Sequence, residues 1–150
     1  MQKSLTSILM LLLSFSIFAE SDDSKNTKIA NGYEVHFNAF STSFLTKEVA
    51  KNYQIGRSKT RGMLNIAVLK QQKDEVSLPV SAKINLKAQN LYGQSKDVEL
   101  RKISENDGAI YYIGTFSVSS RETIIFKASV IPEGQKSAIQ IKFDQEFYTD

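Results

Sequence analysis

Residues 80–89 have the sequence VSAKINLKAQ, and this stretch decides the fold class. Apolar and polar residues alternate strictly along it. Successive side chains of a β-strand point to opposite faces, so the pattern predicts a strand with one dry face and one wet face. Similar alternation predicts five further strands, at residues 33–39, 63–68, 97–103, 123–131 and 138–148. Residues 109–118 are apolar on both faces and predict a strand in the middle of a sheet.

Seven short strands with turn residues between them predict an all-β fold. Their spacing over about 115 residues is typical of an immunoglobulin-like antiparallel β-sandwich built from two sheets, with a small barrel as the alternative. Turn-rich segments at residues 105–108, 119–122 and 133–136 predict hairpins. On this basis we expect the last three strands to form one antiparallel meander.

The long loop after the first strand, residues 40–61, interrupts the alternation. Residues 46–53 predict a short helix, because Thr46 can cap its N-terminus and Glu48 stands in its first turn. Val49 and Tyr53 are four residues apart, so we expect both to pack on the sandwich. Loops of this length in compact domains are often functional.

Composition excludes several kinds of site. The 150 residues contain no cysteine and one histidine, which excludes disulfides, thiol nucleophiles and sites with two imidazole ligands. The formal net charge of +3 is mild and no basic stripe stands out, which argues against nucleic acid as a partner. No G-x-G-x-x-G pattern is present to hold a phosphate. We therefore predict no cofactor, no metal site and no catalytic residues.

The N-terminus predicts export. Lys3 precedes a mostly apolar run over residues 5–18, which is too short for a membrane span and typical of a signal peptide over residues 1–19. Cleavage after Ala19 or after Ser21 fits the small residues there. The polar residues 20–31 predict a flexible leader, and residues 32–150 a single domain. We expect a periplasmic protein with no stable membrane span after cleavage.

Two groups of residues are candidates for a binding surface. His36 and Asn38 alternate outward on the first predicted strand, and Arg57, Lys59 and Arg61 concentrate positive charge in the long loop. Arginine pairs bidentately with carboxylates and phosphates. The alternative, purely structural interpretations are that His36 is hydrogen-bonded to the backbone under the long loop and that the basic loop is solvated. A hydrolase or lyase using His36 with Arg57 or Arg61 is an alternative, which requires these side chains to meet.

The chain resembles a known family in several segments. Residues 32–40 (GYEVHFNAF), 43–46 (SFLT), 48–50 (EVA) and 57–59 (RSK) are similar to the proteobacterial family called domain of unknown function 4426. Residues 109–113 (AIYYI) and the closing Phe147 and Tyr148 fit as well. The resemblance implies an exported protein of similar length and supplies no catalytic residues.

Together these features favour a non-catalytic binding or accessory module of the cell envelope. The expected partner is an envelope protein, a peptide or an anionic polymer. A chaperone-like protein that pairs a sheet edge with a client strand is a further alternative, and it predicts a long unprotected edge strand. Lysines on the strands, such as Lys83, Lys87 and Lys127, would protect such edges.

Overall fold

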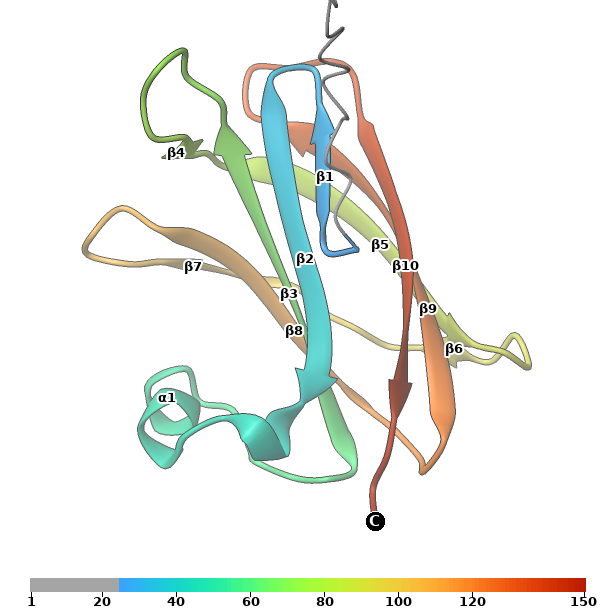
Figure 1. The fold of residues 1–150 in the computed structure, drawn as a ribbon. Coiled ribbons are helices and arrows are strands. Elements are labelled where there is room, and N and C mark those ends of the chain that lie inside the picture. The colour runs from blue at the N-terminus through green and yellow to red at the C-terminus, as the bar shows by residue number, and fades with distance from the viewer. Residues whose placement is uncertain (1–24) are drawn as a thin grey trace, which may run out of the picture.

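Two antiparallel β-sheets pack face to face in the computed structural model, which describes residues 25–150 (Figure 1). The all-β sandwich predicted from the sequence is confirmed. Each of the seven predicted strands has a counterpart, although the one predicted over residues 97–103 is a strand only from residue 101 onward. Three short strands, β1, β4 and β6, were not predicted. The first sheet has the order β1 (Thr27–Ala30), β2 (Tyr33–Ser41), β3 (Arg61–Lys70), β8 (Ile110–Ser117), β7 (Arg101–Ser104), with β4 (Leu78–Pro79) on the end of β3. The second has the order β10 (Ile139–Phe147), β9 (Glu122–Pro132), β5 (Ala82–Asn90), β6 (Ser95–Lys96).

The core between the sheets follows the alternation that the sequence shows. Phe126 of β9 is fully buried and stacks on Phe143 of β10, with ring centroids 4.8 Å apart. Phe116 of β8 meets Phe126 edge to face at 5.4 Å. Aromatic pairs in such geometries add to the stabilisation from buried area. Aliphatic side chains complete the layer: Val35, Leu64, Ile66, Val68, Ile124, Val130, Ile139 and Ile141.

The predicted meander of the last three strands is wrong. β8 lies in the first sheet between β3 and β7, whereas β9 lies in the second sheet between β10 and β5. Because both edges of β8 are already paired, β9 cannot join it, and residues 118–121 cross from one sheet to the other. The hairpins predicted at residues 105–108 and 133–136 are confirmed, since they link β7 to β8 and β9 to β10.

The prediction of a flexible leader over residues 20–31 is wrong for residues 27–30, which form a strand. Residues 27–30 form β1, which pairs with β2 in antiparallel register. Asn31 and Gly32 link the two strands with φ of 54° and 79°. Two positive φ values at an Asn-Gly pair are typical of the tight hairpin turn that matches strand twist. The predicted signal peptide, residues 1–19, lies outside the described residues.

The predicted helix is confirmed as α1 (Lys47–Asn52), and a short 3-10 helix, η1 (Thr42–Phe44), precedes it. The Thr46 hydroxyl caps α1 by accepting a hydrogen bond from the Val49 N–H at 3.2 Å. Val49 itself is exposed, so the prediction that it packs on the sandwich is wrong. Ala50 is buried and Tyr53 half-buried, because that face of α1 is the one turned toward the first sheet (Figure 1).

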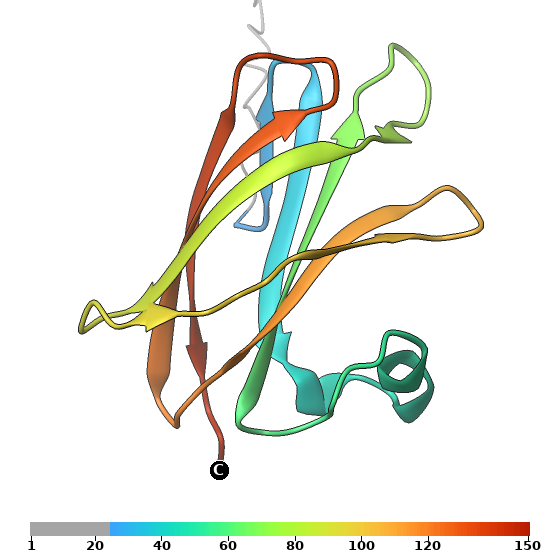
Figure 2. The same cartoon turned by 180° about the vertical axis from the view of Figure 1, so that it is seen from behind.

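A second crossing between the sheets runs from β6 to β7. Figure 2 shows this segment, residues 97–100, passing from the second sheet to the first. It passes so close to β8 that a Cβ at Gly114 would lie 2.7 Å from the Val98 Cγ1 and 2.9 Å from the Glu99 carbonyl oxygen. Gly114 therefore allows the crossing. Among residues 25–150, no helix is long and apolar enough to cross a bilayer.

Candidate functional site

The structure divides the predicted binding residues into two groups. His36 lies opposite Ala67 on β3, and Arg61 begins the same strand six residues earlier. At about 3.3 Å per residue, this separates them by roughly 20 Å along the sheet. His36 and Arg61 therefore belong to different places on the surface, and the strand register does not support a hydrolase or lyase that uses them together.

His36 takes part in a hydrogen-bonded network on the outward face of the first sheet. Its Nδ1 lies 3.0 Å from the Thr27 hydroxyl of β1, and its Nε2 lies 3.2 Å from the Glu34 carboxylate. Partial burial tends to raise the pKa of Glu34, but hydrogen bonds from Ser77, Gln71 and His36 outweigh it and lower that pKa. The network joins β1, β2 and the segment before β4, so it holds the short edge strand in place.

Asn38 lies directly opposite Asn65 on the same face. The Oδ1 atoms of both side chains are buried, and neither accepts a hydrogen bond within the part of the chain that the structure describes. A buried acceptor without a partner costs free energy. Asn65 also lies directly opposite Ile113 of β8, which packs with Ile55 from the turn after α1.

The loop cations have different surroundings. Arg57 donates from Nη2 to the Ser43 carbonyl at 3.1 Å, which ties it to the preceding η1 segment. Lys59 is exposed, and its side chain makes no ion pair or hydrogen bond within residues 25–150. The fully buried Thr42 accepts a hydrogen bond on its hydroxyl from the Ser58 N–H at 2.9 Å. This bond holds the chain near Ser58 against the start of η1. Of the three predicted cations, Arg61 is the one that lines a groove.

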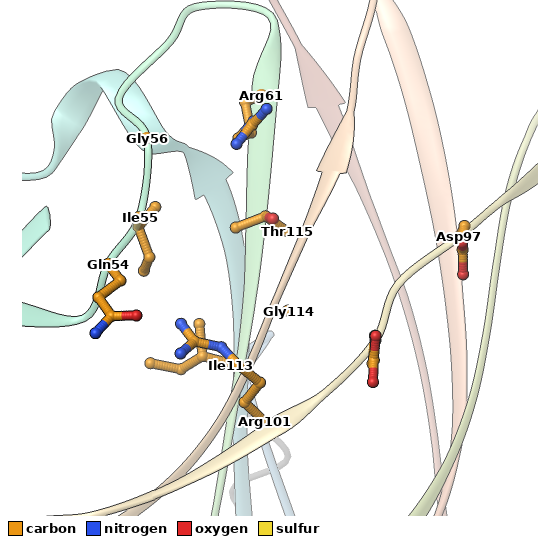
Figure 3. A pocket seen from close by; sticks show the side chains of 10 residues that line it. Gln54, Ile55, Gly56, Arg61, Asp97, Arg101, Ile113, Gly114 and Thr115 are labelled. Atoms are coloured by element: carbon orange, nitrogen blue, oxygen red, sulfur yellow. The ribbon is translucent and has the colours of Figure 1, made fainter.

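This groove, called here the Arg61 groove, has a volume of about 410 Å³ (Figure 3). Its walls come from the turn after α1, from the outward side of β8 and from the crossing segment that leads into β7. In the view of Figure 3, Thr115 lies between Arg61 and Arg101, and Asp97 lies on the far side. The lining residues are Gln54, Ile55, Gly56, Arg61, Asp97, Glu99, Arg101, Ile113, Gly114 and Thr115.

The two arginines of the groove differ in their partners. Arg101 donates from Nη2 to the Tyr53 carbonyl at 2.7 Å, which fixes its side chain against the turn after α1. Tyr53 in turn donates its hydroxyl to Glu105, and this bond, with burial, raises the pKa of Tyr53 to about 12. The side chain of Arg61 makes no ion pair or hydrogen bond with any residue from 25 to 150.

Carboxylates stand across the groove from Arg61. Asp97 and Glu99 are exposed, and neither forms an ion pair with the two arginines in the described chain. The groove thus offers unpaired guanidinium donors and unpaired carboxylate acceptors within one hollow. This arrangement suits a ligand that carries both charges. Across residues 25–150, no three His, Asp or Glu side chains converge to hold a metal ion.

Sequence reasoning missed most of this groove. It found Arg61 from charge density and did not include Asp97, Glu99, Arg101 or Thr115. A signal for the first three was present, because they alternate with the inward-facing Val98 and Leu100. What the sequence could not show is that the crossing segment brings them beside the turn after α1.

Two comparisons with known proteins point to the same family. The family described as Domain of unknown function (DUF4426) matches residues 27–150. The crystal structure of a DUF4426 family protein from Pseudomonas aeruginosa PAO1 is similar, with 33% sequence identity and a TM-score of 0.68. The alignment covers 83% of this chain and 94% of that chain. No curated protein matched the chain.

Proposed function

The chain belongs to the DUF4426 family, whose description assigns no activity, and from that premise we propose that it is a non-catalytic binding module of the bacterial cell envelope. The family resemblance predicted from the sequence is thereby confirmed. The ligand we propose is a short peptide end that carries a free carboxylate. The observation that supports this most is the unpaired Arg61 guanidinium inside the groove.

Arg61 has the chemistry that a carboxylate requires. A guanidinium offers five N–H donors in a fixed fork, and a carboxylate accepts two of them in parallel. No described residue uses the donors of Arg61, so the ligand does not have to displace a partner. Thr115 between the two arginines adds a hydroxyl, which can donate to the same carboxylate.

The acids of the groove favour a peptide over a simple anion. Asp97 and Glu99 would repel a polyanion, whereas they would attract an amino group. Ile55 and Ile113 add apolar surface to the lining. A short peptide carries a carboxylate, an amino group and small apolar side chains, which matches this lining.

The test is calorimetric titration with trialanine. We expect binding by the wild-type protein, and a loss of about tenfold or more in affinity for Arg61→Ala, since a charge-assisted bond contributes roughly 1.5–3 kcal/mol. Lys59→Ala removes the same charge from the same loop outside the groove and is the matched control. Trialanine amide, which lacks the carboxylate, should bind as weakly to the wild type as trialanine binds to Arg61→Ala. Equal affinity of both peptides, or of both variants, would contradict the proposal.

The envelope location rests on the sequence of residues 1–19. Fusing residues 1–21 to a reporter enzyme that is active only outside the cytoplasm tests it. We expect activity from this fusion and none after Leu11→Arg and Leu12→Arg, because charge in the apolar run prevents export. An inactive wild-type fusion would remove the envelope from the proposal and leave the binding groove untouched.

A second candidate is a sheet-edge binder, and β10 is the observation that favours it. This nine-residue strand ends the second sheet and pairs with β9 alone in the described structure. Lys142, Asp144 and Glu146 on its wet face reduce its tendency to pair with another strand. Because the chain has no cysteine, Gln140→Cys gives a unique attachment point for a photo-crosslinker. Capture of a client at Gln140 but not at an equivalent position on β9, Ser129→Cys, would favour this candidate.

A further inference from the structure

Three lysines form a row across the outward face of the second sheet. Lys87 of β5 lies directly opposite Lys127 of β9, and Lys127 lies directly opposite Lys142 of β10. All three residues are exposed. Neighbouring strands are about 4.8 Å apart, so the row places three cations within roughly 10 Å.

This lysine row is unfavourable for the isolated protein. Like charges directly opposite each other on a sheet destabilise it. Within residues 25–150, none of the three lysines makes an ion pair or a side-chain hydrogen bond that would offset the repulsion. Asp144 is the next outward residue after Lys142 on β10 and offsets part of the charge at that end of the row, but no acidic residue lies directly opposite Lys87 or Lys127. An external anionic partner would supply the missing charge.

The strand that carries Lys87 leads into a hairpin with an apolar tip. Leu91 is 67% exposed and Tyr92 is 91% exposed. Figure 2 shows this hairpin, between β5 and β6, projecting from the end of the second sheet. Two large apolar side chains held in water are a feature that a partner would cover.

The base of the hairpin is rigid, so the tip stays exposed. Asn90 is 4% exposed, donates to Glu122 at 2.9 Å and to Gln94 at 2.7 Å, and accepts the Tyr92 N–H at 3.1 Å. Lys96 pairs with the same Glu122 at 2.7 Å, and both side chains are largely buried. The tip is therefore held in place by a buried polar network.

We propose that the lysine row and the Leu91–Tyr92 tip form a docking surface for a bilayer of anionic phospholipids. The sheet face is broad, and a bilayer presents a dense array of phosphates to it. The interfacial zone of a bilayer also takes up tyrosine and leucine side chains. A bilayer thus satisfies both features, whereas a purely anionic polymer such as polyglutamate would leave the apolar tip exposed.

Vesicle co-sedimentation of the purified protein tests this proposal. Vesicles contain phosphatidylglycerol and phosphatidylcholine in equal amounts, or phosphatidylcholine alone. We expect binding to the anionic vesicles that weakens as NaCl is raised, and weak binding to the neutral ones. A basic residue near an anionic membrane contributes about fivefold to binding, so Lys87→Gln, Lys127→Gln and Lys142→Gln together should weaken it roughly 100-fold.

The control variants test whether a loss of vesicle binding comes from the lysine row itself, from a change in stability, or from the Arg61 groove. Lys47→Gln, Lys51→Gln and Lys73→Gln together remove the same charge from exposed lysines elsewhere and should weaken binding far less. Leu91→Ser with Tyr92→Ser should weaken binding without altering its salt dependence. The lysine-row variant loses repulsion, so we expect its melting temperature to be unchanged or raised. The Arg61 groove lies on the other sheet, so Arg61→Ala should bind vesicles normally.

Three results would overturn the proposal. One is equal binding to anionic and neutral vesicles. Another is an equal loss of binding in the lysine-row variant and in the matched control. The third is binding to polyglutamate that depends on the row, with no binding to vesicles, which would assign the surface to an acidic polymer.

Discussion

Replacing Gly114 with alanine tests how the fold positions the groove. Gly114 has no positive φ, so its backbone conformation is open to alanine. If the added methyl group met no obstruction, the substitution would stabilise the protein by about 0.4–1 kcal/mol, because alanine lowers the conformational entropy of the unfolded chain. Here the added Cβ would lie 2.7 Å from Val98 and 2.9 Å from the backbone of Glu99. Overpacking of this kind costs about 1–3 kcal/mol. We therefore expect a net destabilisation of about 1–2 kcal/mol.

The assay is urea unfolding followed by far-ultraviolet circular dichroism, which suits a chain without tryptophan. Thr115→Ala, next to Gly114 but on the outward face, is the control and should change the free energy of unfolding by less than about 0.5 kcal/mol. Gly114→Ala should also weaken trialanine binding, because the crossing segment, which carries Glu99 and leads into Arg101, must move. An unchanged or raised stability would refute the reasoning about the close approach.

Further variants test the core and the polar networks. Phe126→Ala should cost about 3–5 kcal/mol in urea unfolding, whereas Phe44→Ala, at a side chain 80% exposed, should cost less than about 0.5 kcal/mol; similar costs would contradict the assigned core. Asn65→Val should raise the free energy of unfolding by about 1 kcal/mol, because it removes a buried acceptor without a partner, and a loss of stability would show that this oxygen is satisfied. Burial tends to raise the pKa of Glu122, but hydrogen bonds from Lys96, Asn90 and the Ser119 N–H lower it below its ordinary value near 4.5. The folded pKa is therefore below the unfolded one, so Glu122 stabilises the protein above about pH 4.5 and this stabilisation is lost as the pH falls through the folded pKa. Glu122→Gln should accordingly flatten the acid side of a plot of melting temperature against pH, and an unchanged slope would argue against the network.

The sequence predicted the strands well because burial on one face forces a period of two. The alternation in residues 80–89 and 123–131 is therefore recovered as β5 and β9 almost residue for residue. Pairing between strands was harder, because a turn signal such as residues 119–122 is the same for a hairpin and for a crossing between sheets. β1 was not predicted, because its polar composition resembles a flexible leader. The Asn31-Gly32 pair that follows it is a hairpin signal that could have identified the strand.

The candidate site was predictable only in part. Charge density identified Arg61, and alternation placed His36 on an outward face. Neither feature of the sequence says how far apart the two side chains lie in the fold. The separation of these two residues follows from strand register, and the presence of Arg61 and Arg101 in one groove follows from the crossing segment over Gly114. Both depend on contacts between residues far apart in the sequence. The lysine row has the same origin, because it needs three strands in register.

The most direct test of the binding groove is a two-dimensional amide nuclear magnetic resonance spectrum recorded while trialanine is added. We predict concentration-dependent shifts at the backbone amides of Gly56, Gly114 and Thr115, and no shift at the amide of His36 on the distant part of the sheet. Saturable shifts confined to other amides, or no shifts at the groove at high peptide concentration, would contradict this prediction.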